Sequence, residues 1–178
     1  PCLPVDLYLT HRELAELASS NPSNKLLHGR GQPGTHDIAL GRSCLERLRS
    51  INESATSKAG QSDTVELPVF DKSLHGGEGD RSSAMVRVEA PVDVVLFEGW
   101  CVGFASIEPE AIKRRYAAAK SNGNAAGRSP YFLEHSIESL LDIDRRLQDY
   151  EKQWYTLFDT FIQLRPVASG QGSDPQDA

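Results

Sequence analysis

The pattern of hydrophobic and polar residues along the chain predicts strands that alternate with helices. Its most apolar stretch, residues 92–97, is nearly unbroken and rich in β-branched side chains. Such a run is typical of a strand buried on both faces of a parallel sheet. Shorter strand candidates lie at residues 4–9, 65–70 and 161–164, and Pro68 restricts the second of these to a sheet edge or an extended entry.

Helical spacing of apolar residues appears in four segments. The predicted helices cover residues 10–21, about 37–51, 108–120 and 137–158. Thr10 and Glu13 have the spacing of a capping box, which marks the start of the first helix. The last segment is one long helix, or two helices separated near Tyr150.

Because the predicted strands and helices alternate, the fold class is expected to be a three-layer α/β architecture with a parallel sheet. A chain of 178 residues is long enough for one domain with a substantial core and too short for two. Residues 52–64 and 121–130 are polar and predicted to be surface loops. We therefore expect one domain over residues 1–166 and a polar, disordered tail over residues 167–178.

Composition removes several classes of function. The formal net charge of −6 and the pI of about 5.4 argue against a nucleic-acid partner. The chain contains no apolar run of membrane-spanning length, so we expect no membrane partner. The three cysteines are odd in number and far apart in sequence, which predicts reduced thiols and a cytoplasmic location.

Residues 28–37 form the first candidate for chemistry. Gly29, Gly31 and Gly34 match the dinucleotide-binding pattern G-x-G-x-x-G, but the preceding residues are too few and too polar to form the buried strand that this motif requires. The better interpretation is a polar loop that carries Arg30, His36 and Asp37 to a small polar ligand.

Residues 71–81 form a second candidate. This segment contains three glycines together with Asp71, Lys72 and Arg81. A glycine-rich backbone can wrap an anion, and both cations would add charge-assisted hydrogen bonds. The alternative is an ordinary surface hairpin. The chain has no phosphate-binding G-x-x-x-x-G-K-[ST] loop.

Carboxylates at predicted strand ends form the third candidate. Glu98 and Gly99 close the strand at residues 92–97, where a group that organises a metal or transfers protons would stand in an open α/β sheet. The alternative is a strand that ends at a solvated glutamate. Asp6 and Tyr8 fall between a predicted strand and a helix, and each could equally be a turn aspartate or a partly buried tyrosine.

Three motifs, in order along the chain, resemble the D-glycerate 3-kinase family. They are GQPGTHD at residues 31–37, DKSLHGGEGDR at 71–81 and DVVLFEGW at 93–100. The family consists of P-loop kinases of plants and fungi that are similar to phosphoribulokinase and uridine kinase. The resemblance covers roughly residues 6–164.

The resemblance implies a P-loop NTPase-like fold and transfer of the ATP γ-phosphoryl group to a hydroxyl of glycerate or a similar hydroxy acid, with Mg²⁺. It implies that Glu98 organises Mg²⁺, through water, and that Asp6 acts on the acceptor hydroxyl as a general base. The positions that it places around the acceptor are Tyr8, Arg30, His36, Asp37, Asp71, Lys72 and Arg81.

The chain departs from the family pattern in two respects. The first strand, the Walker A loop and its helix are not found in this sequence, and Val5 stands where the family has the first aspartate of Asp-Asp-Phe-Tyr-Leu-Thr. We therefore expect an incomplete kinase domain that transfers phosphate poorly or not at all by itself. Two alternatives remain open: a non-catalytic binding or regulatory module derived from a P-loop kinase, and a structural interaction protein that uses the long aromatic helix.

Overall fold

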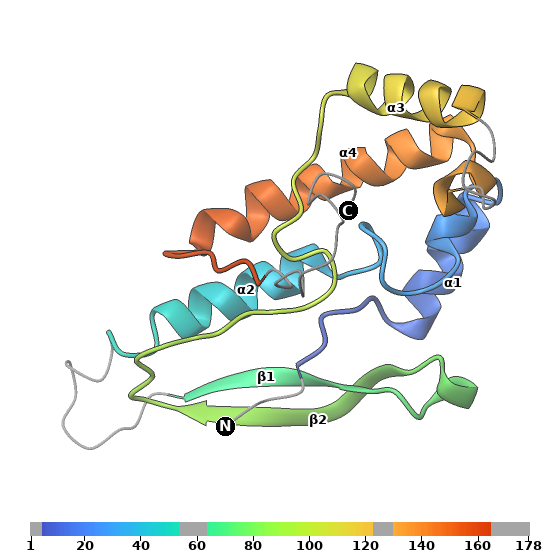
Figure 1. Ribbon diagram of the computed structural model, residues 1–178. Coiled ribbons are helices and arrows are strands. Elements are labelled where there is room, and N and C mark those ends of the chain that lie inside the picture. Colours follow the sequence, from blue (N-terminus) through green and yellow to red (C-terminus); the bar gives the residue numbers. More distant parts are fainter. Residues whose placement is uncertain (1–4, 54–63, 123–129, 165–178) are drawn as a thin grey trace, which may run out of the picture.

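The computed structural model describes residues 5–53, 64–122 and 130–164, so the predicted tail at 167–178 lies outside the described residues. A β-hairpin packs on one helix, α2, and α4 and α3 follow on the other side of that helix (Figure 1). The helices are α1 (His11–Ser20), α2 (Ile38–Arg49), α3 (Pro109–Asn122) and α4 (Ile137–Gln153), and the strands are β1 (Thr64–Asp71) and β2 (Asp80–Glu89).

All four predicted helices are confirmed, and local polar side chains explain where they begin. Thr10 and Glu13 form the expected capping box: the Thr10 N–H donates to Glu13 Oε2 (2.8 Å), and the Glu13 N–H donates to Thr10 Oγ1 (3.3 Å). Asp37 caps α2 by accepting from the Leu40 N–H at 2.9 Å. Each cap satisfies backbone donors that the first helical turn leaves free. The last helical segment divides at Trp154, after which a short 3-10 helix covers Tyr155–Leu157.

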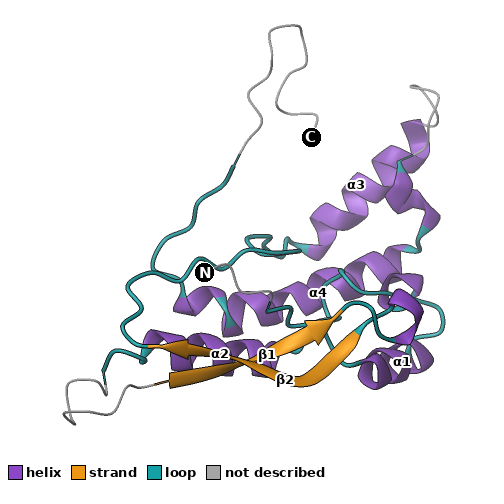
Figure 2. Ribbon diagram, turned by 90° about the horizontal axis from the view of Figure 1, so that it is seen from below, coloured by secondary structure: helices purple, strands orange, loops and turns teal. Residues whose placement is uncertain are grey.

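Residues 64–89 form an antiparallel hairpin, in which Val65 pairs with Val88 and Asp71 with Asp80 (Figure 2). The strand predicted at residues 65–70 is confirmed. The backbone of residues 71–81 forms the turn of a hairpin, which was the alternative interpretation of this segment. The register shifts between Pro68 and Phe70, because proline has no N–H to donate to a ladder. In the hairpin turn, Gly79 has φ +74°, and a Cβ there would lie 2.6 Å from the Phe70 ring, so this position requires glycine.

The predicted parallel sheet is not present among the described residues, whose sheet is the two-stranded β1–β2 hairpin. Residues 92–97 are extended without strand pairing, and the expectation of burial on both faces is wrong: Val94 and Leu96 are 82% and 83% exposed. An apolar run becomes a buried strand only when neighbouring strands and covering helices surround it. Residues 161–164 are likewise exposed and outside any strand, and residues 5–9 form a single bridge, Tyr8 to His36.

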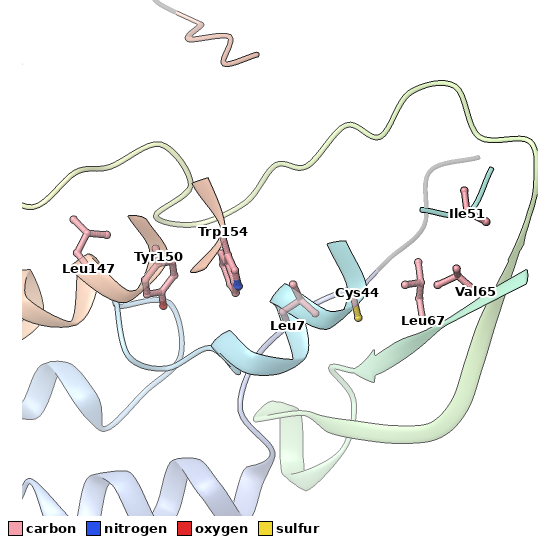
Figure 3. Close-up of a cluster of buried hydrophobic side chains, with 8 residues drawn as sticks. All are labelled: Leu7, Cys44, Ile51, Val65, Leu67, Leu147, Tyr150 and Trp154. Carbon is pink, nitrogen blue, oxygen red and sulfur yellow. The ribbon is translucent and has the colours of Figure 1, made fainter. Parts of the chain in front are cut away.

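The main core lies where α2, α4 and the hairpin meet. Its buried side chains are Leu7, Cys44, Ile51, Val65, Leu67, Leu147, Tyr150 and Trp154 (Figure 3). The predicted inward side chains of α2 agree with this arrangement, since Ile38, Leu45 and Leu48 pack against this cluster. The core therefore holds α2, α4 and β1 together, and the polar segments that precede α2 and follow β1 contribute to the candidate site.

Candidate functional site

Four of the residues selected from the sequence, Asp6, Arg30, His36 and Lys72, gather around a fifth, Tyr8. We call this group of five the Tyr8 site. Lys72 Nζ lies 2.9 Å from Asp6 Oδ2. The Tyr8 ring stacks on the His36 ring at 4.7 Å and meets the Phe70 ring edge-on at 5.5 Å. The site thus combines one carboxylate, two cations and an aromatic floor.

The charges of the Tyr8 site influence one another. The hydrogen bond from Lys72 to Asp6 raises the pKa of Lys72, so the ammonium stays charged. Burial and the nearby Asp6 charge raise the pKa of Tyr8, so the phenol stays neutral at physiological pH. Because Arg30 adds a positive charge that no carboxylate neutralises among the described contacts, the site favours a small anion.

Arg30 is held in place on both sides. Its Nη2 donates to the Gly79 carbonyl at 2.6 Å, and its guanidinium lies 4.9 Å from the centre of the Phe70 ring. Its Nε is buried and has no hydrogen-bond partner in the described part of the chain. A buried N–H without a partner is costly, so an anion that reached this nitrogen would relieve that cost.

The loop that carries Arg30 is closed by the segment that follows Glu98. Gly31 has φ +116°, and a Cβ there would lie 3.0 Å from the Trp100 ring. The Cys101 thiol donates to the Gly31 carbonyl at 3.0 Å. Glycine at position 31 therefore permits both the turn and the close approach of Trp100.

His36 is buried beneath Tyr8 and is anchored by α4. Its Nδ1 lies 2.7 Å from Tyr150 Oη, and that oxygen accepts from the Gly34 N–H at 3.1 Å. Burial lowers the pKa of His36 to about 4 and raises that of Tyr150. Because the Tyr150 oxygen already accepts one hydrogen bond, its own hydrogen is available to donate to the neutral imidazole.

Acidification is expected to destabilise the protein through His36. Its pKa is about 4 in the folded chain and 6.5 ordinarily, so between these values the unfolded chain binds more protons and stability falls as the pH falls. The difference corresponds to about 3 kcal/mol between neutral pH and pH 4. Urea unfolding at pH 7.5 and 4.5 measures it, and His36→Asn should show a smaller loss on acidification.

The exposed His28 provides the matched control for this experiment. His28→Asn should keep the pH dependence of the unmodified chain. If His36→Asn lost as much stability on acidification as the unmodified chain does, His36 would not be the group responsible.

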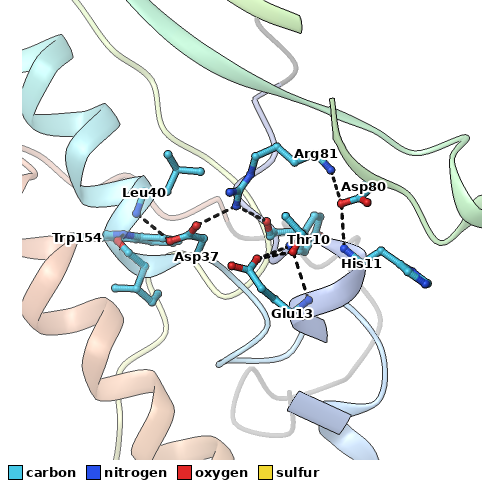
Figure 4. A network of polar contacts seen from close by, with 10 residues as sticks. Thr10, His11, Glu13, Asp37, Leu40, Asp80, Arg81 and Trp154 are labelled. Atoms are coloured by element: carbon cyan, nitrogen blue, oxygen red, sulfur yellow. Dashed lines mark hydrogen bonds and ion pairs between the residues drawn. The ribbon is translucent and has the colours of Figure 1, made fainter. Parts of the chain in front are cut away.

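Asp37 and Arg81 lie beside the Tyr8 site and bind each other (Figure 4). Arg81 Nη2 donates to Asp37 Oδ2 at 2.9 Å and to the Tyr8 carbonyl at 3.2 Å. Asp37 also caps α2 and donates its N–H to the Leu7 carbonyl at 2.8 Å. This pair therefore connects the hairpin, through Arg81, to the backbone at Leu7 and Tyr8.

Two further predicted residues stand apart from the Tyr8 site. Asp71 accepts from the N–H and hydroxyl of Ser73 at 2.8 and 2.6 Å, which forms a local turn and lowers the pKa of Asp71. Glu98 is exposed and makes no hydrogen bond or ion pair with the residues that the structure describes. The described residues also contain no group of three or more histidine, cysteine or acidic side chains arranged to hold a metal ion.

Sequence reasoning missed the histidine stack that anchors the hairpin turn. The rings of His11 and His75 lie 3.9 Å apart and nearly parallel. Asp80 joins them by accepting from the His11 N–H at 2.9 Å and by contacting His75 Nε2 at 3.1 Å. No periodic signal links positions 64 residues apart. The contact of Tyr150 with His36 was likewise not predictable, because Tyr150 lies within an aromatic stripe interpreted as core.

The chain is similar in sequence to proteins that are named as ATP-dependent kinases. It is 43% identical over 102 residues to the probable ATP-dependent kinase TDA10 of Saccharomyces cerevisiae, with 57% of this chain and 33% of that protein covered. It is 38% identical over 110 residues to the chloroplastic D-glycerate 3-kinase of Arabidopsis thaliana, with 61% and 23% covered. No protein-family model matches the chain.

A solved structure is similar over a larger part of the chain. The D-glycerate 3-kinase of Cryptococcus neoformans var. grubii is 41% identical, with a TM-score of 0.74, and the match covers 84% of this chain and 48% of that one. The predicted resemblance is thus confirmed: the homologues of this chain are D-glycerate 3-kinases and related ATP-dependent kinases, and its α/β fold matches theirs. The chain spans less than half of the length of each of these three proteins.

The described helices are also informative about membranes. None of them combines the length and the apolar character needed to cross a bilayer.

Proposed function

We propose that this chain carries the acceptor-binding portion of an ATP-dependent phosphotransferase of the D-glycerate 3-kinase type. The observation that carries the proposal is the convergence of Asp6, Tyr8, Arg30 and Lys72 from three separate parts of the sequence. A small hydroxy acid needs cations for its carboxylate and a polar group for its hydroxyl, and the Tyr8 site offers both. The sequence similarity to D-glycerate 3-kinases supports this substrate class.

In this proposal Lys72 and Arg30 bind the carboxylate of the acceptor, and the Tyr8 ring forms the floor on which it rests. Asp6 lies beside Lys72 at 2.9 Å, and it orients the reacting hydroxyl and accepts its proton as phosphoryl transfer proceeds. His36 stays neutral and supports the Tyr8 ring from below. Asp37, Asp71 and Arg81 hold the surrounding loops.

The donor side of the reaction requires more than these residues provide. ATP supplies the phosphoryl group, but the 178 residues contain no G-x-x-x-x-G-K-[ST] loop to cradle its phosphates. Glu98 is a fitting single ligand for Mg²⁺, because this ion is held mainly by water and phosphate oxygens with one or two carboxylates. We therefore propose that the chain is an incomplete P-loop kinase domain with little activity alone, and that it functions in the cytoplasm.

A non-catalytic binding module is the second candidate function. It is favoured by the same observation, namely an intact Tyr8 site in a sequence without a phosphate-binding loop. A module of this kind would bind the hydroxy acid and would gain no activity from any added polypeptide.

Calorimetric titration of the chain with MgATP and then with D-glycerate tests the proposed function. We expect no measurable MgATP binding, since the phosphate cradle is missing, and measurable D-glycerate binding at the Tyr8 site. Micromolar MgATP binding would contradict the donor half of the proposal. Absence of D-glycerate binding by the folded chain would contradict the acceptor half.

A further inference from the structure

One buried aromatic side chain of the hairpin lies outside the main core. Phe70, near the end of β1, is 6% exposed, yet it does not belong to the cluster of side chains where α2, α4 and the hairpin meet. Its burial accompanies the register shift in the hairpin. Val65 and Leu67 are buried before the shift, and Phe70 rather than Val69 is buried after it. An irregularity of this kind redirects side chains, and here Phe70 faces the Tyr8 site.

Tyr8, Arg30 and the backbone of the hairpin turn meet at the Phe70 ring. The Tyr8 ring lies edge-on to it at 5.5 Å, and the Arg30 guanidinium lies 4.9 Å from its centre. The turn is equally close, since a Cβ at Gly79 would lie 2.6 Å from the ring. The Gly79 carbonyl is also the group that accepts from Arg30 Nη2 at 2.6 Å. Phe70 therefore supports both contacts that hold Arg30, and it determines where Arg30 lies relative to Tyr8.

The Phe70 ring holds the Arg30 cation without neutralising it. Two other cations of this region are each paired with a carboxylate: Lys72 with Asp6 and Arg81 with Asp37, both at 2.9 Å. The contacts that the structure describes for Arg30 are instead a carbonyl and an aromatic face. An aromatic face attracts a cation through its quadrupole and carries no net charge. The positive charge of Arg30 thus remains available to an anionic ligand.

We propose that Phe70 is a positioning residue of the Tyr8 site, and that its ring holds Arg30 where the guanidinium receives the carboxylate of the acceptor. This inference rests on the proposed function. Phe70 acts through Arg30 and is not a catalytic residue. A carboxylate in place of the ring would also hold Arg30, but it would cancel the charge that attracts the acceptor. The Arg30 Nε, which is buried without a hydrogen-bond partner in the described part of the chain, is the donor that the acceptor would reach.

Stepwise fluorination of the Phe70 ring tests the proposal, because fluorine withdraws electron density from the ring face and nearly preserves the size of the ring. The full 178-residue chain is made with mono-, di- or trifluorophenylalanine at position 70, and D-glycerate binding is measured by calorimetry. We expect the affinity to fall at each step, by roughly threefold to tenfold overall, as the cation–π attraction is removed. A ring that only fills space would give the same affinity throughout the series.

The same fluorinated series at Phe97 is the matched control. Phe97 is half-buried and packs on the rings of Trp154 at 5.5 Å and Phe158 at 5.8 Å, and no cation lies over its ring in the described part of the chain. Fluorination there should leave the D-glycerate affinity unchanged. Equal losses at the two positions, or one affinity for every ring at position 70, would overturn the role of Phe70 and leave the proposed function standing.

A measurement without ligand keeps the two proposals separate. In the free chain, the NMR resonance of the Arg30 Nε–H should be shifted by the ring current of Phe70. In Phe70→Leu, shown to be folded by circular dichroism, it should move to the position of an exposed arginine such as Arg114. If no version of the chain binds D-glycerate, the acceptor half of the proposed function fails and this resonance still decides the inference. Loss of the shift would support the placement of Arg30 by Phe70, and an unchanged resonance would overturn it.

Discussion

Replacing Trp154 with alanine should lower the free energy of unfolding by about 4 kcal/mol, the usual cost of removing a large buried aromatic side chain. Trp154 is 1% exposed and packs on Tyr150 at 4.8 Å. Its indole N–H donates to the Ile38 carbonyl at 2.9 Å. The variant would therefore leave a cavity and an unsatisfied carbonyl where α2 meets α4. Urea unfolding followed by circular dichroism measures the loss.

Trp100→Ala is the matched control, because it removes the same side chain from a site that is 68% exposed. Its cost should stay below about 1 kcal/mol, since little buried surface is lost. Equal losses for the two variants would contradict the packing described here. A smaller loss for Trp154→Ala than for Trp100→Ala would contradict it more strongly.

Lys72→Met should weaken D-glycerate binding by roughly tenfold to 100-fold, the range expected when a charge-assisted hydrogen bond to a carboxylate is lost. Two effects act in the same direction. The variant loses the cation that attracts the acceptor, and it leaves Asp6 without the ammonium that lies 2.9 Å away. The uncompensated Asp6 carboxylate would then repel the carboxylate of the acceptor.

A double-mutant cycle separates these two effects. Asp6→Asn combined with Lys72→Met should recover part of the lost affinity, because the repulsion is removed while the attraction stays absent. Lys25→Met, at an exposed site at the start of a short 3-10 helix, should bind D-glycerate as the unmodified chain does. If Lys72→Met bound with unchanged affinity, Lys72 would have no part in acceptor binding.

The sequence was sufficient to predict the helices, because their determinants are local. The Thr10–Glu13 capping box and the Asp37 cap act within one helical turn, so short-range patterns locate α1 and α2. Of the two strands of the hairpin, only β1 could be predicted. The exposed β2 residues Met85 and Arg87 alternate with half-buried Val86 and Val88, a weaker signal than a continuous apolar run.

The sheet could not be predicted correctly, because strand formation depends on partners that are distant in sequence. Residues 92–97 have the composition of a buried strand, yet no strand among the described residues lies beside them. The same limit applies to the candidate site. Asp6, Arg30 and Lys72 could be selected by residue type, but the Tyr150 anchor of His36 and the His11–His75 stack depend on tertiary packing.

The central claim is that the Tyr8 site binds a small hydroxy acid through its carboxylate. The most direct measurement compares the calorimetric titration of D-glycerate with that of glycerol, which has similar hydroxyl groups and no carboxylate. We predict saturable binding of D-glycerate that weakens in Lys72→Met, and no measurable binding of glycerol. Equal binding of the two compounds, or D-glycerate binding that is indifferent to Lys72, would contradict the claim.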